Sequence, residues 1–152
     1  MDRSFYVDTL YPLQDHALRT ITRTGTGFYL SGGTAASRGY LQHRFSDDLD
    51  LFVNDDERFG LWARQLVQAL EGIAGCQLKV LDMQERFVRL RLISPDSFLK
   101  IELINDVPAH VGEIVTHEFL GRLDSAANIM ANKITAAIDR QEPRDLADIW
   151  GF

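Results

Sequence analysis

The sequence predicts an α+β fold in which a short mixed sheet has helices packed on one face. Three strand-like segments follow one another at residues 77–82, 86–93 and 98–104, and a polar turn at residues 94–97 joins the last two. Segments with the 3.6-residue apolar period of amphipathic helices stand before and after them. Strands joined by short turns favour antiparallel pairing, so we expect these three strands to form a meander that extends the sheet.

Length and composition indicate one globular domain over residues 1–152. At 17.2 kDa the chain is large enough to bury a core, and its 45% of hydrophobic residues fits a soluble protein. Cys76 is the single cysteine, which excludes an intramolecular disulfide. No early apolar run follows a basic start, so we expect a cytoplasmic protein without a membrane span.

The charge distribution bears on the class of partner. A net charge of −6 and a pI near 5.1 argue against nucleic-acid binding through a general positive field. Six carboxylates lie between residues 44 and 57, where Arg44 is the only opposing charge. A bound metal ion would offset part of this cluster, which keeps an RNA partner open. Four basic residues on neighbouring strand segments are expected to form a modest basic strip: Arg86, Arg89, Arg91 and Lys100.

The first half of the chain is expected to alternate helices and strands. Apolar residues recur at four-residue spacing over residues 12–23, and Pro12 suits the first turn of a helix. The elements expected next are a buried strand at 28–31, a tight turn at 32–33, a short helix at 34–41 and a strand at 48–53. A helix then follows whose apolar stripe is Trp62, Leu66, Ala69, Leu70 and Ile73.

The last third of the chain is expected to be mainly helical. Residues 112–121 read as a short strand or a connector. Asp124 or Ser125 can cap a helix, and Pro143 suits the first turn of another. The buried stripe expected for the first of these helices is Ala126, Met130, Ile134, Ala137 and Ile138.

Two carboxylates in the strand at 48–53 are the main candidates for chemistry. Side chains two apart in a strand share a face, so Asp48 and Asp50 project together. Carboxylates this close repel each other, and a cation that neutralises both removes the repulsion. Mg²⁺ prefers a few carboxylate oxygens together with phosphates and water, so we expect a metal site. The alternative is a solvated pair on an edge strand, which the flanking apolar residues make costly.

A Gly-Gly turn precedes the carboxylates. If a helix begins at Thr34, its first backbone N–H groups form an anion site, and Gly32 and Gly33 let a phosphate approach the backbone. A simple tight turn is the alternative. Thr34 and Ser46 are further candidates for the same site, or merely capping residues. Arg44 either pairs with Asp47 or meets a phosphate.

Two blocks of sequence carry a family resemblance. The first block is Ser31-Gly32-Gly33-Thr34-Ala35 followed by His43-Arg44-Phe45-Ser46-Asp47-Asp48-Leu49-Asp50-Leu51-Phe52. The second is Asn128-Ile129-Met130-Ala131-Asn132-Lys133-Ile134-Thr135-Ala136-Ala137, then Arg140 and Pro143-Arg144-Asp145-Leu146-Ala147-Asp148-Ile149. In this order they resemble the nucleotidyltransferase-like proteins of the AbiEii/AbiGii toxin family, within the polymerase-beta-type nucleotidyltransferase superfamily. The resemblance implies the nucleotidyltransferase fold.

The resemblance also implies roles for residues outside the first block. It calls for a third acidic residue on a neighbouring strand, and Glu102 is the candidate for binding a second metal ion or activating the acceptor. A solvent-facing pair with Lys100, on the same face, is the alternative. Lys133 is implied to contact a phosphate, although a lysine at the edge of an apolar stripe is commonly structural. Arg144 and Asp145 are either nucleotide-binding residues or a structural ion pair.

The activity that the resemblance implies is Mg²⁺- or Mn²⁺-dependent transfer of a nucleotidyl group. The donor is a nucleoside triphosphate, and the acceptor is a hydroxyl of RNA, such as transfer RNA, or of a protein. The family consists of toxins of bacterial toxin–antitoxin or phage-defence systems, so an antitoxin partner is implied. The sequence specifies neither the nucleotide nor the acceptor.

A second hypothesis is a catalytically silent module that binds a nucleotide or a partner. The second block ends close to the end of the chain, whereas related proteins usually continue into a larger helical region. The sequence is then either a minimal version or a fragment truncated in that region. Ile149, Trp150 and Phe152 are expected to be exposed and to form a homodimer or partner surface.

Two histidines and two glutamates between residues 110 and 118 are potential zinc ligands. The residues concerned are His110, Glu113, His117 and Glu118. Their spacing matches no compact zinc-ligand pattern, so we expect surface histidines here.

Overall fold

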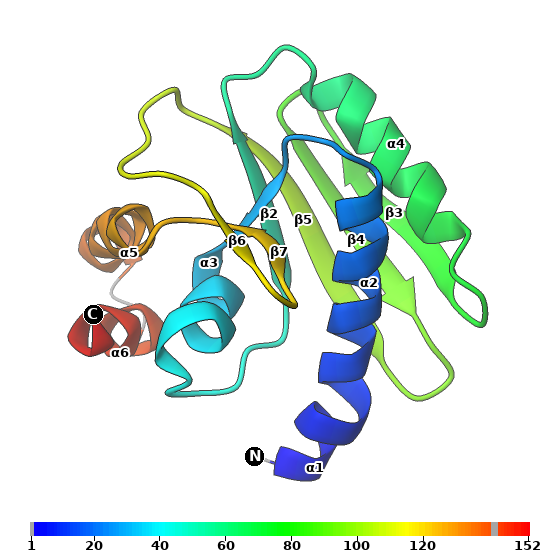
Figure 1. Cartoon of the computed structure of the whole chain (residues 1–152), viewed down its shortest axis with the longest axis horizontal. Coiled ribbons are helices and arrows are strands. Elements are labelled where there is room, and N and C mark those ends of the chain that lie inside the picture. Colours follow the sequence, from blue (N-terminus) through cyan, green and yellow to red (C-terminus); the bar gives the residue numbers. More distant parts are fainter. Residues whose placement is uncertain (1, 141–142) are drawn as a thin grey trace.

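The fold is built on a seven-stranded mixed sheet with the strand order β3-β4-β5-β2-β1-β7-β6 (Figure 1). The computed structural model describes residues 2–140 and 143–152, with the side chains of residues 2–139 and 147–152. The strands are β1 (Tyr29–Ser31), β2 (Leu49–Asn54), β3 (Gln77–Met83), β4 (Phe87–Ile93), β5 (Phe98–Asp106), β6 (Val115–His117) and β7 (Gly121–Leu123). The pairs β2/β5 and β1/β7 are parallel, and the other neighbours are antiparallel.

The predicted α+β class and mixed sheet are confirmed. The strands β3, β4 and β5 form the expected antiparallel meander, and β5 continues the sheet by pairing with β2. The side chains of β2 alternate between fully buried and half-buried, as a strand with one core-facing side requires. Residues 112–121, left open by the sequence, contribute β6 and part of the β6–β7 hairpin.

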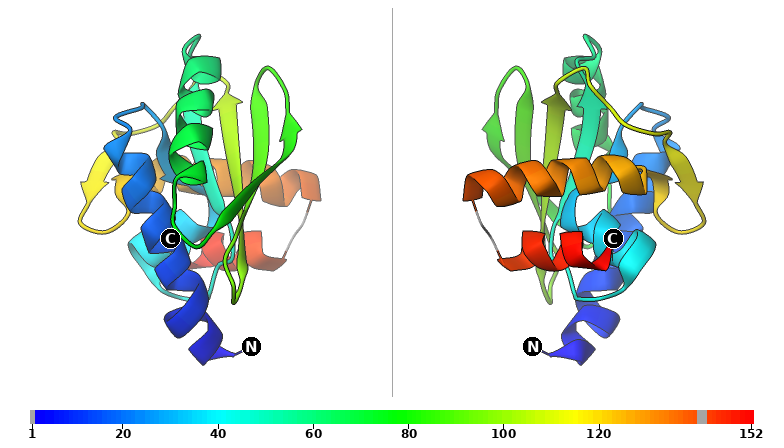
Figure 2. Two further views of the ribbon diagram at one scale, coloured as in Figure 1. Left: turned by 90° about the vertical axis from the view of Figure 1, so that its right-hand side faces the viewer. Right: turned by 90° about the vertical axis from the view of Figure 1, so that its left-hand side faces the viewer.

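Helices lie on both sides of the sheet (Figure 2), rather than on the one face that the sequence predicts, and are made from the following segments. They are α1 (Arg3–Phe5), η1 (Tyr6–Leu10), α2 (Tyr11–Arg23), α3 (Gly32–Thr34), η2 (Ala35–Leu41), α4 (Phe59–Glu71), α5 (Ala126–Arg140) and α6 (Pro143–Gly151). Figure 2 shows α2 and α4 in front of the sheet in one view, and α5 and α6 in front of it in the opposite view. The main core fills the α2/α4 side, where Leu49, Leu51 and Val53 of β2 are buried.

Two helices begin earlier than the sequence predicts. Helical backbone runs from Arg3 through η1 and α2 to Arg23, so the helix does not start at Pro12. The wider π-type turn of η1 precedes Pro12 and accommodates a residue that has no backbone N–H to donate. The second helical segment starts at Gly32 rather than at Thr34, because Ser31 takes the extended N-cap conformation.

The predicted buried stripe of α5 is wrong for its two isoleucines, whereas Ala126, Met130 and Ala137 are half-buried. Ile134 and Ile138 are 45% and 73% exposed, whereas Ile129 and Lys133 are buried. The helix turns its polar Lys133 inward because a buried carboxylate on α6 pairs with that side chain. Apolar periodicity therefore gave the existence of the helix but the wrong face.

The C-terminal residues are less exposed than expected. Trp150 is 93% exposed, but Ile149 and Phe152 are half-buried, and the ring of Phe152 packs 6.1 Å from that of Tyr40. The homodimer surface stays a prediction, with Trp150 as its one exposed member among these three. None of the helices in the described part of the chain has the length and apolarity needed to cross a membrane.

Candidate active site

Pairing of four strands lines up one row of polar residues across the sheet. Ser31 of β1 lies opposite Asp50 of β2, Asp50 lies opposite Glu102 of β5, and Glu102 lies opposite Arg89 of β4. Residues directly opposite in a sheet share a face, so all four project to the same side. That side is the one turned toward α5, away from the main core.

Asp50 is the carboxylate of this row that makes no direct ion pair with a described residue, although the charges of Lys100 and Lys133 act on it from further away. Within the described residues, no group donates a hydrogen bond to its carboxylate and none forms an ion pair with it. Burial and the nearby carboxylates of Glu102 and Asp48 raise the pKa of Asp50 to about 6. A divalent cation placed here would offset the repulsion that raises this pKa.

Gly32 leaves the space that Asp50 occupies. A Cβ on Gly32 would lie 2.6 Å from Oδ2 of Asp50, and the backbone of Gly32 has φ +72°, which favours glycine. Gly33 is less constrained, because a Cβ there would lie 2.5 Å from Nη2 of Arg44, which is the far end of a flexible side chain. A glycine at position 32 is thus needed for Asp50 to stand where it does.

Asp48 and Glu102 are tied together by cations. The Lys100 Nζ atom lies 3.4 Å from Oδ2 of Asp48 and 3.7 Å from Oε1 of Glu102. The Arg89 Nε atom donates a hydrogen bond of 3.1 Å to Oε2 of Glu102. The expected Lys100/Glu102 pair is therefore present, and it faces the cleft through its contact with Asp48.

A contact between Thr34 and Ser46 connects the two segments of the first block of sequence. Both are buried, and their hydroxyl oxygens lie 2.7 Å apart. Thr34 also donates a hydrogen bond to the backbone carbonyl of Asp48. Neither hydroxyl makes a capping hydrogen bond to a helix; together they fix the entry of β2 relative to the glycine turn.

A buried carboxylate on α6 gathers the basic residues of both blocks. Asp148 is fully buried and accepts two hydrogen bonds of 3.0 Å from Arg44. His43 Nε2 lies 2.5 Å from Oδ1, and Lys133 Nζ lies 3.1 Å from Oδ2. Burial acts to raise the pKa of Asp148, but the hydrogen bonds from Arg44 and Lys133 outweigh it and lower that pKa below its ordinary value.

These groups face one another across a cleft of about 340 Å³. The sheet contributes the carboxylates, and α5 contributes Lys133 from the opposite wall. The residues lining the cleft include Gly32, Gly33, Arg44, Ser46, Asp48, Asp50, Lys100, Glu102, Asn132 and Lys133. One wall of the cleft is acidic and the other is basic, an arrangement suited to a metal-bound polyphosphate.

The donor set fits one divalent metal ion. Asp48 and Asp50 offer hard carboxylate oxygens on one face, and Asp50 has a carboxylate that the described residues leave without a donor. No group of three or more His, Cys, Asp or Glu side chains among those described is arranged to hold a metal ion. Glu102 lies opposite Asp50 in the sheet, and both of its carboxylate oxygens lie near cations.

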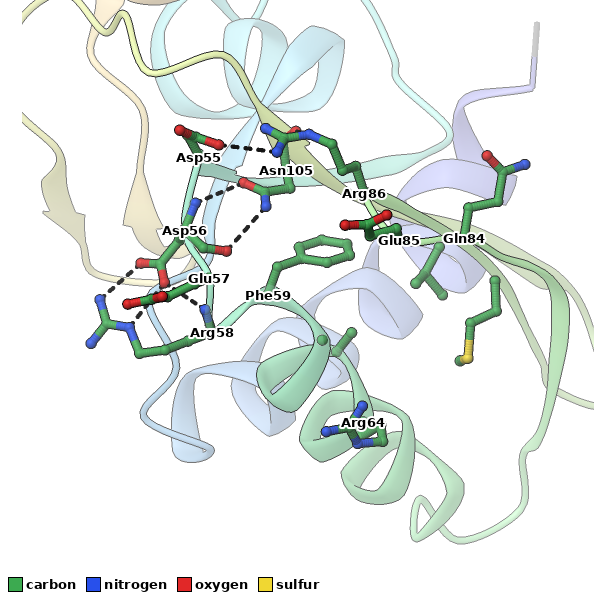
Figure 3. A pocket seen from close by; sticks show the side chains of 14 residues that line it. Asp55, Asp56, Glu57, Arg58, Phe59, Arg64, Gln84, Glu85, Arg86 and Asn105 are labelled. Carbon is green, nitrogen blue, oxygen red and sulfur yellow. Dashed lines mark hydrogen bonds and ion pairs between the residues drawn. The ribbon is translucent and has the colours of Figure 1, made fainter.

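A larger cleft of about 1020 Å³ lies between α4 and the β3–β4 hairpin (Figure 3). Its charged side chains largely pair with one another: Asp56 with Arg58 at 2.8 Å, and Asp55 with Arg86 at 3.0 Å. Asn105 exchanges two hydrogen bonds with the backbone of Asp56. These contacts hold the loop after β2 to the hairpin, so the five residues that make them have a structural role.

Most of the predicted site residues come together in the smaller cleft. Arg44 pairs with Asp148 rather than with Asp47, which resolves that alternative. Arg144 and Asp145 are in α6, but their side chains lie outside the described residues. Of the basic strip, Arg89 and Lys100 turn toward Glu102, whereas Arg91 lies 4.9 Å from the ring of Phe98.

Sequence reasoning missed His43, Lys100 and Asp148 as parts of the site. Asp148 stands within the second block, and its position among apolar residues of a helix is the signal that could have pointed to it. The predicted surface histidines are only half-exposed. His110 Nε2 lies 2.7 Å from Oδ1 of the buried Asp124, and His117 accepts backbone hydrogen bonds from the β6–β7 turn.

Comparisons with known proteins agree with this architecture. JHP933 from Helicobacter pylori has a TM-score of 0.66 at 24% identity, over 90% of this chain and 62% of that chain. MenT4, a nucleotidyltransferase toxin from Mycobacterium tuberculosis, has a TM-score of 0.67 at 22% identity, over 91% of this chain and 56% of that chain. These likenesses concern the fold, and the chain spans about three fifths of the length of such structures. No curated protein matches the sequence.

The family profile described as nucleotidyl transferase AbiEii toxin, type IV TA system, matches residues 17–151. The match includes both blocks of sequence and every residue named in the cleft. The chain belongs to the AbiEii nucleotidyl transferase toxin family.

Proposed function

We propose that the protein is a Mg²⁺-dependent nucleotidyltransferase that uses a nucleoside triphosphate. The observation that carries this proposal is that carboxylates and cationic side chains line the same cleft. Asp48 and Asp50 stand on the sheet, and Arg44 and Lys133 stand across from them, held by Asp148. Family membership supports the same reaction class, and Mn²⁺ is the expected substitute for Mg²⁺.

Each group has a distinct task in this proposal. Asp48 and Asp50 hold the divalent cation, which as a Lewis acid would neutralise charge on phosphate oxygens. Arg44 and Lys133 contact the triphosphate, because both cationic groups line the cleft and Asp148 holds them there. Backbone N–H groups at Gly32 and Gly33 donate hydrogen bonds to phosphate oxygens at the start of the helical segment.

The reaction is a displacement at phosphorus. The oxygen of the acceptor hydroxyl forms a bond to the α-phosphorus, and the bond between that phosphorus and the oxygen bridging to the β-phosphate breaks. Pyrophosphate leaves with the electron pair of the broken bond, and the hydroxyl proton passes to a carboxylate facing the cleft. The chain's own contribution is alignment and charge, which are the main sources of rate in phosphoryl chemistry.

We propose RNA as the acceptor, because a basic groove adjoins the cleft. This groove, of about 690 Å³, shares Arg44 and Phe45 with the cleft. Its other lining residues include Arg3, Arg38, His43, His117 and Phe119. Phe119 is 64% exposed, which offers a ring for stacking of an unpaired base next to cations that suit a phosphate backbone. A protein hydroxyl is the competing acceptor.

We further propose that the protein acts as a toxin neutralised by an antitoxin. The support is the family, whose description names a type IV toxin–antitoxin system. Nucleotidyl transfer to an essential RNA would account for toxicity, and a partner that restrains the enzyme or reverses its effect would be required for growth.

Calorimetric titration tests the donor site. Each nucleoside triphosphate is titrated with and without Mg²⁺ into the wild-type protein, into Asp48→Asn/Asp50→Asn and into Asp96→Asn, a variant of an exposed turn residue. We expect Mg²⁺-dependent binding that the double variant loses and the control retains. Triphosphate binding that survives in the double variant would contradict the assignment of Asp48 and Asp50.

Transfer of label tests the reaction and its acceptor. The protein is incubated with each triphosphate labelled at the α-phosphate, together with total RNA or total protein. Label in the RNA fraction supports the proposal, and label in the protein fraction replaces RNA by a protein acceptor. Tight nucleotide binding with label in neither fraction favours the catalytically silent module.

A further inference from the structure

The carboxylate of Glu102 is fully engaged by cations within the sheet. Arg89 approaches Oε2 at 3.1 Å and Lys100 approaches Oε1 at 3.7 Å. The Glu102 side chain is only 17% exposed, whereas that of Lys100 is 38% exposed. Lys100 therefore extends from the strand toward the cleft, and the more buried Glu102 holds it there through their ion pair.

The sheet register explains why Lys100 stands beside the carboxylate pair. Lys100 and Glu102 are two apart on β5, so they share a face. β5 runs parallel to β2, with Leu49 opposite Ile101, which brings Lys100 alongside the start of β2. The Lys100 Nζ atom then lies 3.4 Å from Oδ2 of Asp48, closer than to Glu102.

We infer that Lys100 is a built-in cation of the site and that the cleft takes one divalent ion, on Asp48 and Asp50. This inference rests on the proposed nucleotidyltransferase function and adds to it. Lys100 is a positioning residue that bridges Asp48 to Glu102. Its ammonium group occupies the position in which a second metal ion would bind to Glu102. The role of Glu102 as a metal ligand stays a prediction from the sequence. It is the alternative to this inference, because it would place a second metal ion in the cleft.

Charge favours a single ion. The three carboxylates Asp48, Asp50 and Glu102, taken with Arg89 and Lys100, keep one net negative charge. One divalent ion reverses this charge and suits an incoming triphosphate. A second divalent ion would have to displace both Arg89 and Lys100 from Glu102 or lie beside them, and like charges at such distances repel strongly in a partly buried site.

The same geometry makes Lys100 a competitor of the metal ion. Its ammonium group lies against an oxygen of Asp48 that would otherwise be free to bind metal. Removing this charge should therefore strengthen binding of the first ion. The opposite result, unchanged or weaker metal binding, is expected if the main effect of Lys100 is to hold Asp48 in place.

Binding of Mn²⁺ alone tests the inference without turnover. Isotherms are recorded by calorimetry and by electron paramagnetic resonance for the wild type, Lys100→Met, Lys100→Arg and Lys79→Met, in which an exposed lysine of β3 is replaced. We expect one Mn²⁺ per wild-type chain, about tenfold tighter binding in Lys100→Met, and wild-type affinity in the other two variants. Thermal unfolding confirms that each variant is folded.

The outcomes separate this inference from the proposed function. Two Mn²⁺ ions per wild-type chain, or unchanged affinity in Lys100→Met, would overturn the role of Lys100 while leaving the nucleotidyltransferase proposal in place. If Lys100→Met fails to fold, the stoichiometry of the wild type and the affinity of Lys100→Arg still decide. Absence of both Mn²⁺ and triphosphate binding in the wild type would refute the proposed function and this inference together.

Discussion

Arg44 and Asp148 lie 104 residues apart in the chain and form a two-point ion pair, with Nε–Oδ1 and Nη2–Oδ2 distances of 3.0 Å. The carboxylate is fully buried, and Lys133 contacts it as well. This pair joins the segment before β2 to the C-terminal helix. The basic wall of the cleft therefore depends on a residue that is not itself basic.

Replacing Asp148 by Asn should destabilise the protein and disorder the basic wall. The variant keeps the shape of the side chain but removes the buried negative charge that Arg44 and Lys133 share. Breaking a buried ion pair by removing one partner costs about 3–5 kcal/mol. We expect a loss of that order in the free energy of unfolding by urea, together with weaker triphosphate binding. Asp139→Asn, on the exposed face of α5, is the matched control and should change neither quantity.

Replacing Arg44 by Lys should separate charge from geometry. Lysine keeps the positive charge but cannot make the two parallel hydrogen bonds that Arg44 donates to Asp148. We expect a smaller loss of stability than in Asp148→Asn, and a drop in triphosphate affinity of about tenfold, which corresponds to about 1.4 kcal/mol. Wild-type affinity in Arg44→Lys would show that a point charge suffices at this position.

Replacing Gly32 by Ala should damage the metal site beyond its cost in backbone strain. Gly25 provides the control, since its φ of +68° resembles the +72° of Gly32 but a Cβ there would meet nothing within 4 Å. Each substitution places alanine in the left-handed region, at about 1–2 kcal/mol. Only Gly32→Ala also pushes on Asp50, at 2.6 Å. We expect Mn²⁺ affinity to fall at least about tenfold in Gly32→Ala alone; equal affinities in the two variants would contradict this view.

The candidate site could be predicted from the sequence where it depends on local spacing. Asp48 and Asp50 follow from strand alternation, and the Gly-Gly turn follows from its own composition. The meander of β3, β4 and β5 follows from short turns. Each of these features is decided within a few residues along the chain.

The rest of the site depends on contacts that no local pattern encodes. The position of Lys100 beside Asp48 comes from the parallel pairing of β5 with β2, which are separated by α4 and two strands. The inward turn of Lys133 comes from Asp148 on another helix, which outweighs the apolar stripe that would have buried Ile134 and Ile138. Long-range electrostatic partners can thus set the orientation of a helix against its hydrophobic pattern.

Replacing Asp50 by Asn should stabilise the metal-free protein, and more so at high pH. The folded-state pKa of Asp50 is raised to about 6 from an ordinary value of 3.8, so folding opposes its ionised form. This penalty is absent below pH 4, grows as pH rises from the ordinary pKa toward the folded pKa, and is complete above pH 7. It is worth at most about 3 kcal/mol. Asparagine removes the charge and hence the penalty.

Urea unfolding in the presence of a chelator measures this effect. We expect Asp50→Asn to exceed the wild type in unfolding free energy at pH 8 by up to about 3 kcal/mol, with a difference that shrinks steadily toward pH 4. Asp96→Asn, in the exposed turn before β5, should show no such pH dependence. Saturating Mn²⁺ should reverse the order of stabilities at pH 8, because the wild type alone gains stability from bound metal. A difference that is independent of pH would mean that folding leaves the pKa of Asp50 unchanged, because its charge is compensated in the folded protein.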